Sequence, residues 1–216
     1  KGIVVLLAPA YLGYGCGDEG WCQEIMNSNA NMTAWGTYVG NRYKSFPNIV
    51  WVIGGDVDPP AGVKPKLQAM IAAIQAAGDQ HLFTAHNGSE SMATDQWSGE
   101  AWLTVNNVYS YSGTLYQQDL AAYHAGVTKP YFLIENAYEG DSNHDPSAPE
   151  LRAQSYWTVL SGGFGHVFGN CPIWHFSSPA GQQYCSGAWQ SALTSQGTLN
   201  MQYLQKLFTA RHWHLL

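Results

Sequence analysis

Unbroken apolar runs recur along the chain, and each is bounded by glycine, proline or polar residues. The longest are GIVVLLA at residues 2–8 and IVWVI at residues 49–53. Neither run alternates between apolar and polar positions, so each is typical of a strand buried on both faces, as in a parallel sheet. Shorter runs begin near residues 82, 107, 131 and 166. The pattern therefore predicts six strands.

Segments with helical periodicity separate most of these strands. Apolar residues spaced three or four apart predict helices at 32–43, 64–77, 115–125, 149–161 and 199–211. Strands that alternate with helices predict a parallel α/β sheet. Six strands are too few to close an eight-stranded barrel, which usually takes about 250 residues. Two architectures remain: an open α/β sheet, and a (β/α)8 barrel of the TIM type that lacks its first two βα units. Because no linker or repeat interrupts the pattern, residues 1–216 are expected to form one domain.

Composition limits the classes of partner. Charged residues make up 11% of the 216 residues, and the formal net charge is −6 without any cluster of Lys and Arg. A nucleic-acid partner is not expected, because its phosphates need a basic face. No apolar run is long enough to span a membrane. The nine Trp and thirteen Tyr suit a cleft in which rings stack on a ligand, although a large aromatic core would also use them. Nothing in the sequence indicates the oligomeric state.

The four cysteines occur as two pairs that are close in sequence, Cys16 with Cys22 and Cys171 with Cys185. Local pairs in loop-like segments predict two disulfides in an exported protein, periplasmic or extracellular. A zinc site is less expected, because neither pair has the CxxC spacing, and four free thiols in a cytosolic enzyme are the remaining alternative. The chain starts at Lys1 rather than Met, as expected of a processed chain or a piece of a longer one.

Polar or aromatic residues follow the predicted strands, and in a parallel α/β fold these positions face one rim. They are Tyr11, Asp56, His86, Tyr111, Glu135 and Asn170. Two of them, Asp56 and Glu135, are carboxylic acids separated by two intervening strands. Cleavage of a glycosidic bond needs such a pair, because one carboxyl group protonates the leaving oxygen while the other attacks or activates water. The pair therefore favours a glycoside hydrolase with a carbohydrate substrate.

Four stretches of the chain are distinctive: GIVVLLAPAYLG, PNIVWVIGGDVDP, KPYFLIENAYEG and GHVFGNCPIWHF. Together they resemble the apiosidase-like glycoside hydrolases, bacterial (β/α)8 enzymes also described as putative collagenase-linked proteins. The resemblance implies a glycosidase that needs no metal or cofactor and acts on a plant or microbial polysaccharide or oligosaccharide. It places the general acid/base at Asp56 in the GGD motif and the nucleophile of a retaining mechanism at Glu135. The first two βα units of the family have no counterpart in the sequence.

Several of these assignments have structural alternatives. Asp56 or Asp58 could cap the next helix. Glu139 could be the working acid, although Glu135 is preferred because it directly follows a strand. His86 could bind substrate or be a core histidine with its hydrogen bonds satisfied. The candidate sugar platforms, each of which could instead be a core aromatic, are Trp97, Tyr138 and Trp174.

Two other classes of function remain open. A metal-dependent barrel hydrolase could draw ligands from Asp56, His86, Glu135 and His166, but the chain has no HxH or HExxH signature. A non-catalytic sugar-binding module could keep the aromatic cleft without turnover. The two carboxylates that follow strands argue against such a module, whereas the incomplete barrel favours it.

Overall fold

The structure is a computed structural model, and it describes residues 2–17, 19–28, 31–125, 129–176, 184–185 and 187–213. The chain forms two compact units, residues 1–107 and 108–216.

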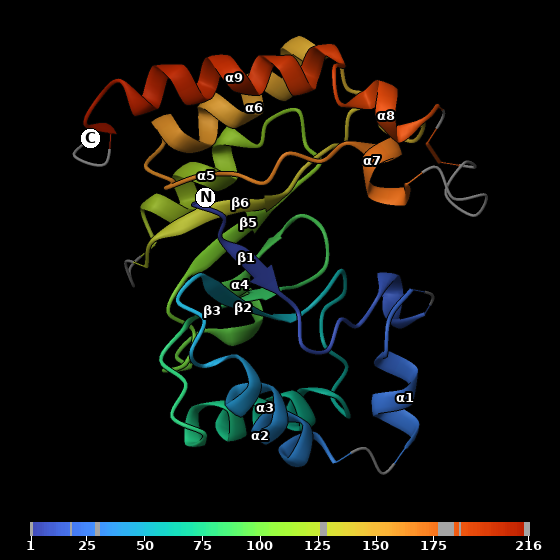
Figure 1. Ribbon diagram of the computed structural model, residues 1–216, viewed down its shortest axis with the longest axis vertical. Coiled ribbons are helices and arrows are strands. Elements are labelled where there is room, and N and C mark those ends of the chain that lie inside the picture. The colour runs from blue at the N-terminus through green and yellow to red at the C-terminus, as the bar shows by residue number, and fades with distance from the viewer. Residues whose placement is uncertain are drawn as a thin grey trace. The chain divides into compact units, whose positions relative to one another are not determined.

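A three-stranded parallel sheet forms the centre of the first unit (Figure 1). Its strands are β1 (Val5–Leu7), β2 (Ile49–Gly54) and β3 (Leu82–His86), in the order β1-β2-β3. The register places Leu7 opposite Trp51 and Gly54 opposite His86. Pairing is parallel throughout, so the prediction of a parallel sheet is confirmed for these strands.

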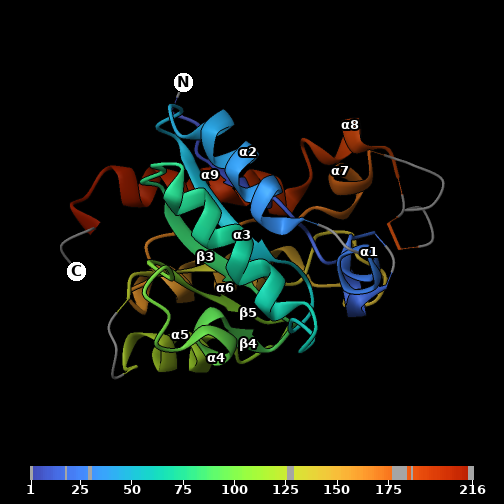
Figure 2. The same cartoon turned by 90° about the horizontal axis from the view of Figure 1, so that it is seen from below.

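Helices α2 (Met32–Tyr43) and α3 (Lys64–Ala76) lie side by side against this sheet (Figure 2). The apolar face expected on α3 is fully buried, with Leu67, Met70 and Ile74 all at 0% exposure. Burying such a side chain stabilises the fold by about 1.5–3 kcal/mol. The unit also contains the turn η1 (Tyr14–Cys16) and the short helices α1 (Cys22–Asn27) and α4 (Ala93–Trp97).

A second three-stranded sheet has the order β4-β5-β6. Its strands are β4 (Ser91–Met92), β5 (Asn106–Tyr109), which contains the boundary between the units, and β6 (Tyr131–Glu135). The strand predicted at 166–169 is wrong, because His166 makes only an isolated parallel bridge with Leu133. Gly165 and Gly169 bound this segment on its two sides, and glycine weakens a strand because it has no side chain to pack.

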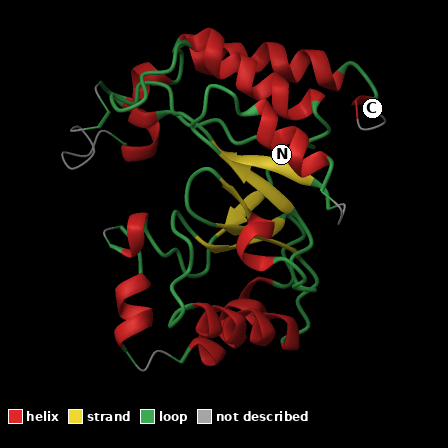
Figure 3. Ribbon diagram, turned by 180° about the vertical axis from the view of Figure 1, so that it is seen from behind, coloured by secondary structure: helices red, strands yellow, loops and turns green. Residues whose placement is uncertain are grey.

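Three helices of the second unit lie close to their predicted positions (Figure 3): α5 (Tyr116–Tyr123), α6 (Ala148–Leu160) and α9 (Gln196–Thr209). The two short helices α7 (Cys171–His175) and α8 (Trp189–Ala192) were not predicted. A capping box starts α6: Ser147 Oγ accepts a hydrogen bond from the Glu150 amide, and the Glu150 side chain accepts one from the Ser147 amide. Helices α6 and α9 pack along each other.

The first strand differs from its prediction. Residues 2–8 were expected to be buried on both faces, but Ile3 is 66% exposed, Val4 62%, and Val5 and Leu6 39% each. The cause is the position of β1, which is the end strand in the order of its sheet. The described strands form two three-stranded sheets, and no closed barrel is observed.

Candidate active site

The backbone turns sharply where β2 ends. Gly54 has φ 80° and Gly55 has φ 146°, and Asp56 itself takes the left-handed conformation with φ 57°. A Cβ on Gly55 would lie 2.1 Å from the Tyr11 ring, so only glycine lets this ring approach the backbone. A non-glycine residue at positive φ is strained, and such strain concentrates at functional sites. The half-buried side chain of Asp56 is therefore a candidate for chemistry.

Asp58 has a structural role in the same loop. Its Oδ1 accepts a hydrogen bond from the Gly88 amide at 3.1 Å, and its Oδ2 accepts one from Gln96 Nε2 at 2.9 Å. These bonds join the loop after β2 to the segment after β3. Helix α3 has Val63 as its N-cap and no side-chain cap, so the alternative that Asp56 or Asp58 caps it is wrong.

His86 ends β3 and is buried at 8% exposure. The next residue, Asn87, donates a hydrogen bond from Nδ2 to the Met92 carbonyl at 2.8 Å and accepts one from Trp97 Nε1 at 3.2 Å. Asn87 was not singled out from the sequence, although its position directly after a strand was a usable signal. It fixes the loop that follows His86.

Trp97 is a core residue. Its side chain is 1% exposed, its ring contacts Trp102 edge to face at 5.1 Å between centroids, and Lys64 Nζ lies 4.6 Å from its centroid. A ring covered in this way cannot stack on a sugar. The expectation that Trp97 is a sugar platform is corrected accordingly, and Trp97 is left out of the proposed site.

Glu135 ends β6 in the second unit. Its backbone carbonyl accepts a hydrogen bond from the Ser110 amide at 3.1 Å, and its carboxylate Oε1 accepts one from the Tyr111 hydroxyl at 2.6 Å. The hydroxyl of Tyr109 lies 3.0 Å from that of Tyr111. A short hydrogen bond to an ionised carboxylate is among the stronger ones in proteins. Glu135 is therefore a half-buried carboxylate held in a defined orientation at a strand end.

Glu139 is committed to structure. Its Oε1 accepts from the Gly197 amide at 2.7 Å, and its Oε2 accepts from Ser195 Oγ at 2.6 Å, from the Thr198 amide at 3.1 Å and from Asn170 Nδ2 at 3.1 Å. The two amides belong to the first turn of α9, where a negative charge is stabilised by the helix dipole. This anchoring favours the other glutamate of the motif as the working acid.

Asn170 is also structural. Its Oδ1 accepts from the Ile173 amide at 3.3 Å and caps α7, while its Nδ2 binds Glu139. The side chain is buried at 7% exposure. Asn170 is left out of the proposed site because these contacts use its side chain, and substrate binding by Asn170 stays a prediction.

Two aromatic rings remain suited to a ligand in the second unit. Tyr138 and Trp174 meet edge to face, with centroids 5.9 Å apart, and Trp174 is 50% exposed. Tyr138 lies against Gly169, where a Cβ would come within 2.3 Å of its ring. Trp174, carried by α7, is the more accessible platform.

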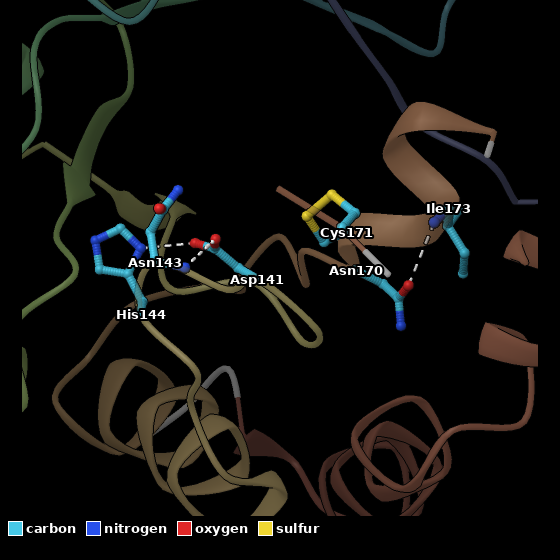
Figure 4. The surroundings of a disulfide bond; sticks show 7 residues. Asp141, Asn143, His144, Asn170, Cys171 and Ile173 are labelled. Atoms are coloured by element: carbon cyan, nitrogen blue, oxygen red, sulfur yellow. Dashed lines mark hydrogen bonds and ion pairs between the residues drawn. A yellow bond between two sulfur atoms is a disulfide. The ribbon is translucent and has the colours of Figure 1, made fainter. Parts of the chain in front are cut away.

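The pair Asp141 and His144, which contacts Tyr111 beside Glu135, was not found from the sequence. The His144 ring stacks on Tyr111 with centroids 4.2 Å apart and planes 9° apart. His144 Nδ1 lies 2.6 Å from Asp141 Oδ2, and Asp141 Oδ1 accepts from the Asn143 amide at 2.9 Å (Figure 4). The only sequence signal was the spacing of an acid and a histidine three residues apart in a polar loop.

Both predicted disulfides are confirmed. Cys16 bonds Cys22 with Cα atoms 5.0 Å apart, and Cys171 bonds Cys185 with Cα atoms 5.2 Å apart. In the part of the chain that the structure describes, no helix has the length and apolar character needed to cross a membrane.

The hypothetical metal ligand His166 lies in a different environment from the strand-end carboxylates. Its Nε2 is 2.9 Å from Ser155 Oγ, and burial lowers the pKa of His166 to about 4. Among the described residues, no group of three or more His, Cys, Asp or Glu side chains lies close enough to hold a metal ion.

A parallel α/β fold with acidic and aromatic side chains at the carboxyl ends of its strands is the arrangement of the α/β enzymes, whose active sites lie at that end. Within this class, the chain belongs to the apiosidase-like family: the model "Apiosidase-like, catalytic domain" matches residues 1–214. A search of curated proteins finds no match.

Solved structures with a similar fold include two glycoside hydrolases. One, titled a glycoside hydrolase, is 25% identical with a TM-score of 0.73, and the match covers 83% of this chain and 46% of that one. The other, a glycoside hydrolase family 5 protein from Bacteroides vulgatus, is 25% identical with a TM-score of 0.71, covering 82% and 44%. The chain thus spans less than half the length of these structures.

Proposed function

We propose that the protein is a retaining glycoside hydrolase that acts on a plant or microbial polysaccharide or oligosaccharide. The observation that carries the proposal is the contrast between two glutamates of one motif. Glu135 is oriented at a strand end by the Tyr111 hydroxyl, whereas Glu139 is used by the start of α9. The family match and the glycoside hydrolase neighbours support the same class of reaction.

In this proposal Glu135 is the nucleophile. Its carboxylate attacks the anomeric carbon while Asp56 donates a proton to the leaving oxygen, so a glycosyl–enzyme ester forms and the leaving alcohol departs neutral. Water then attacks the same carbon, Asp56 takes its proton, and Glu135 is released. Retention by this route needs carboxyl groups about 5–5.5 Å apart, whereas inversion needs about 6.5–9.5 Å.

Substrate contacts in the proposal come from the strand-end aromatics and histidine. Sugar rings present apolar C–H faces that stack on aromatic side chains, and Trp174 is half exposed for such a contact. The residues proposed to bind the substrate are Tyr11, His86, Tyr111, Tyr138 and Trp174.

The proposal extends to the fold and the compartment. We propose a (β/α)8 barrel in which two further βα units precede β1, because the end strand β1 exposes apolar side chains such as Ile3 and Val4. We also propose an exported protein, since disulfides such as Cys171–Cys185 persist in oxidising compartments.

The test is a screen of plant and microbial glycans with the full natural chain and its Glu135→Gln and Asp56→Asn variants. Glu135→Gln is expected to lose more than about 10⁴-fold in kcat for every substrate. Asp56→Asn is expected to lose most on substrates with poor leaving groups, where protonation matters most. Asp58→Asn, a carboxylate beside Asp56 with a structural role, is the matched control.

Three readings of the screen separate the alternatives. The anomer released first, followed by NMR, is expected to have the configuration of the substrate, and the opposite anomer would overturn the retaining mechanism. Glycan binding without hydrolysis by the wild-type protein would instead favour the sugar-binding module. Full activity in Glu135→Gln would remove Glu135 from the mechanism.

A further inference from the structure

The Tyr111 side chain is held at its hydroxyl and on one face of its ring. Its hydroxyl donates to Glu135 Oε1 at 2.6 Å, and one face of its ring is covered by the parallel ring of His144. A tyrosine side chain rotates about two bonds, so the hydroxyl keeps its position only if the ring is held. The stacked histidine restrains the ring on this face, and Tyr109, whose ring meets Tyr111 edge to face at 5.3 Å between centroids, is a second neighbour.

His144 is oriented in turn by Asp141. Its Nδ1 lies 2.6 Å from Asp141 Oδ2, so the ring cannot turn about its Cβ–Cγ bond without losing this bond. Asp141 is nearly buried, at 9% exposure. Its Oδ1 accepts from the Asn143 amide, and its carbonyl accepts from the Asp145 amide at 2.8 Å. Asp141 therefore makes hydrogen bonds with each of the next residues of this turn from 143 to 145.

The Cys171–Cys185 disulfide holds this turn on two sides (Figure 4). Cys185 makes an antiparallel bridge with Asp141, and the neighbouring Ser142 amide donates to the Tyr184 carbonyl at 3.0 Å. Cys171 donates its amide hydrogen to the Glu139 carbonyl at 2.9 Å. The disulfide thus joins two backbone contacts that flank the start of the turn.

We propose that Asp141, His144 and the Cys171–Cys185 disulfide form a positioning unit that holds Tyr111 against Glu135. These residues act through Tyr111 and have no part in bond making or breaking. The inference rests on the proposed function in taking Glu135 as the nucleophile. Its physical content, the orientation of the Tyr111 hydroxyl toward that carboxylate, is measurable without turnover.

A hydrogen bond to a carboxylate favours its ionised form. Loosening Tyr111 should therefore raise the pH at which Glu135 titrates and move the acidic limb of the kcat/KM profile upward. Tyr111→Phe is expected to move both by about one unit. His144→Ala and Asp141→Asn are expected to move them part of the way, with a fall in kcat of about tenfold and little change in KM. His144→Phe keeps a ring on Tyr111 and is expected to restore much of the loss.

The decisive measurement is a double-mutant cycle with Tyr111→Phe. If His144 acts through the Tyr111 hydroxyl, His144→Ala adds no further shift once that hydroxyl is absent. Equal effects of His144→Ala in both backgrounds would overturn the proposal. So would a lower melting temperature with an unchanged acidic limb, the result expected of a merely structural turn.

The first unit contains a matched control. His81 Nδ1 lies 2.9 Å from Asp79 Oδ2, the same pairing in a buried setting. Asp79→Asn is expected to lower stability without moving the acidic limb. Likewise, the Cys171→Ser/Cys185→Ser variant is expected to move the limb, whereas Cys16→Ser/Cys22→Ser is not. If the control variants Asp79→Asn and Cys16→Ser/Cys22→Ser move the acidic limb as far as their counterparts in the second unit, the proposal is overturned.

Titration of the Glu135 carboxyl carbon by ¹³C NMR separates this inference from the proposed function. The signal is assigned by its absence in Glu135→Gln. If the pH midpoint of this titration is higher in His144→Ala while Glu135→Gln still hydrolyses glycans, the positioning unit stands and the catalytic assignment fails. If Glu135→Gln is inactive and the pH midpoint is unchanged in His144→Ala, the catalytic assignment stands and the positioning unit fails.

Discussion

At the residue scale, three carboxylates of the second unit differ through their surroundings. Glu135 receives a phenolic hydrogen bond at a strand end, and Glu139 receives the amides of a helix start. Asp119 on α5 is fully buried; its Oδ2 accepts from Thr158 Oγ1 at 3.1 Å, while its Oδ1 has no hydrogen-bond partner among the described residues. The same chemical group thus accepts a tyrosine hydroxyl at a strand end, binds the first turn of a helix, or is buried with one oxygen unpaired among the described residues.

Asp119 predicts a pH dependence of stability. Burial raises the pKa of Asp119 to about 7, against about 3.9 in an unfolded chain. Between these values the unfolded state releases the proton that the folded state keeps, so the free energy of unfolding falls as pH rises from about 4 to about 7. The expected decrease in the free energy of unfolding is on the order of 4 kcal/mol above pH 7, and there is no decrease below pH 4.

Asp119→Asn removes this ionisation and is expected to be the more stable protein at pH 8. Urea unfolding of both proteins at pH 4, 6 and 8 measures the difference, with the exposed Asp145→Asn as control. A difference that stays constant over this range would contradict the prediction.

Glu139 predicts a large local loss of stability. Glu139→Ala leaves the Gly197 and Thr198 amides without the carboxylate that binds them. An unsatisfied buried donor costs about 1–3 kcal/mol, so a loss of roughly 2–4 kcal/mol is expected in chemical unfolding. Glu150→Ala, which removes an exposed capping-box glutamate from α6, is the control and should cost less. Comparable losses in the two variants would argue against the anchoring role of Glu139.

At the element scale, glycines set the approach of α2 to α3. A Cβ on Gly36 would lie 2.3 Å from the Met70 carbonyl oxygen and 2.9 Å from Ala73 Cβ. A Cβ on Gly40 would lie 3.0 Å from Ala77 Cβ. The backbone of α2 therefore approaches α3 most closely at these two glycines.

Gly36→Ala is expected to destabilise the protein by about 1–3 kcal/mol, because the clash is with backbone and the helices must separate. The sign is informative, since alanine in place of glycine inside a helix is otherwise worth roughly 1 kcal/mol of stability. Thermal unfolding measures the change, and Thr37→Ala on the exposed side of α2 is the control. A more stable Gly36→Ala protein would show that the packing tolerates the methyl group.

At the scale of the whole molecule, each unit contains its own disulfide, and the end strand β1 exposes apolar side chains. An end strand presents unpaired backbone groups that invite pairing with another chain. A formal net charge of −6 spread over 216 residues offers only a general repulsion between molecules.

Residues 1–216 on their own are therefore expected to self-associate through β1. Val4→Lys places a charge on this edge and is expected to lower the associated fraction, as charged residues do on natural sheet edges. Light scattering over a concentration series measures the effect, with Thr37→Lys as a control of equal charge. Equal improvement in both variants would show that net charge, and not the β1 edge, limits solubility.

The sequence by itself determined the positions of β2, β3, β5 and β6, most of the helices, and both disulfides. These features are local: a strand or helix is encoded by the spacing of neighbouring residues, and the paired cysteines are only 6 and 14 residues apart. The sequence wrongly predicted a strand at 166–169 and burial of β1 on both faces. Both features depend on which distant strands pair with a segment, and a local pattern does not contain that information.

Only the tertiary structure decided what the candidate site residues do. The sequence favoured Glu135 over Glu139 only by its place at a strand end, because the partners that bind Glu139, Ser195 and Gly197, are 56 and 58 positions away. Trp97 is covered by Lys64, which lies on another helix, and His144 reaches Tyr111 from a different loop. Hydrogen bonds and ring contacts act over a few ångströms in space, and the folded chain alone brings these distant residues within that range.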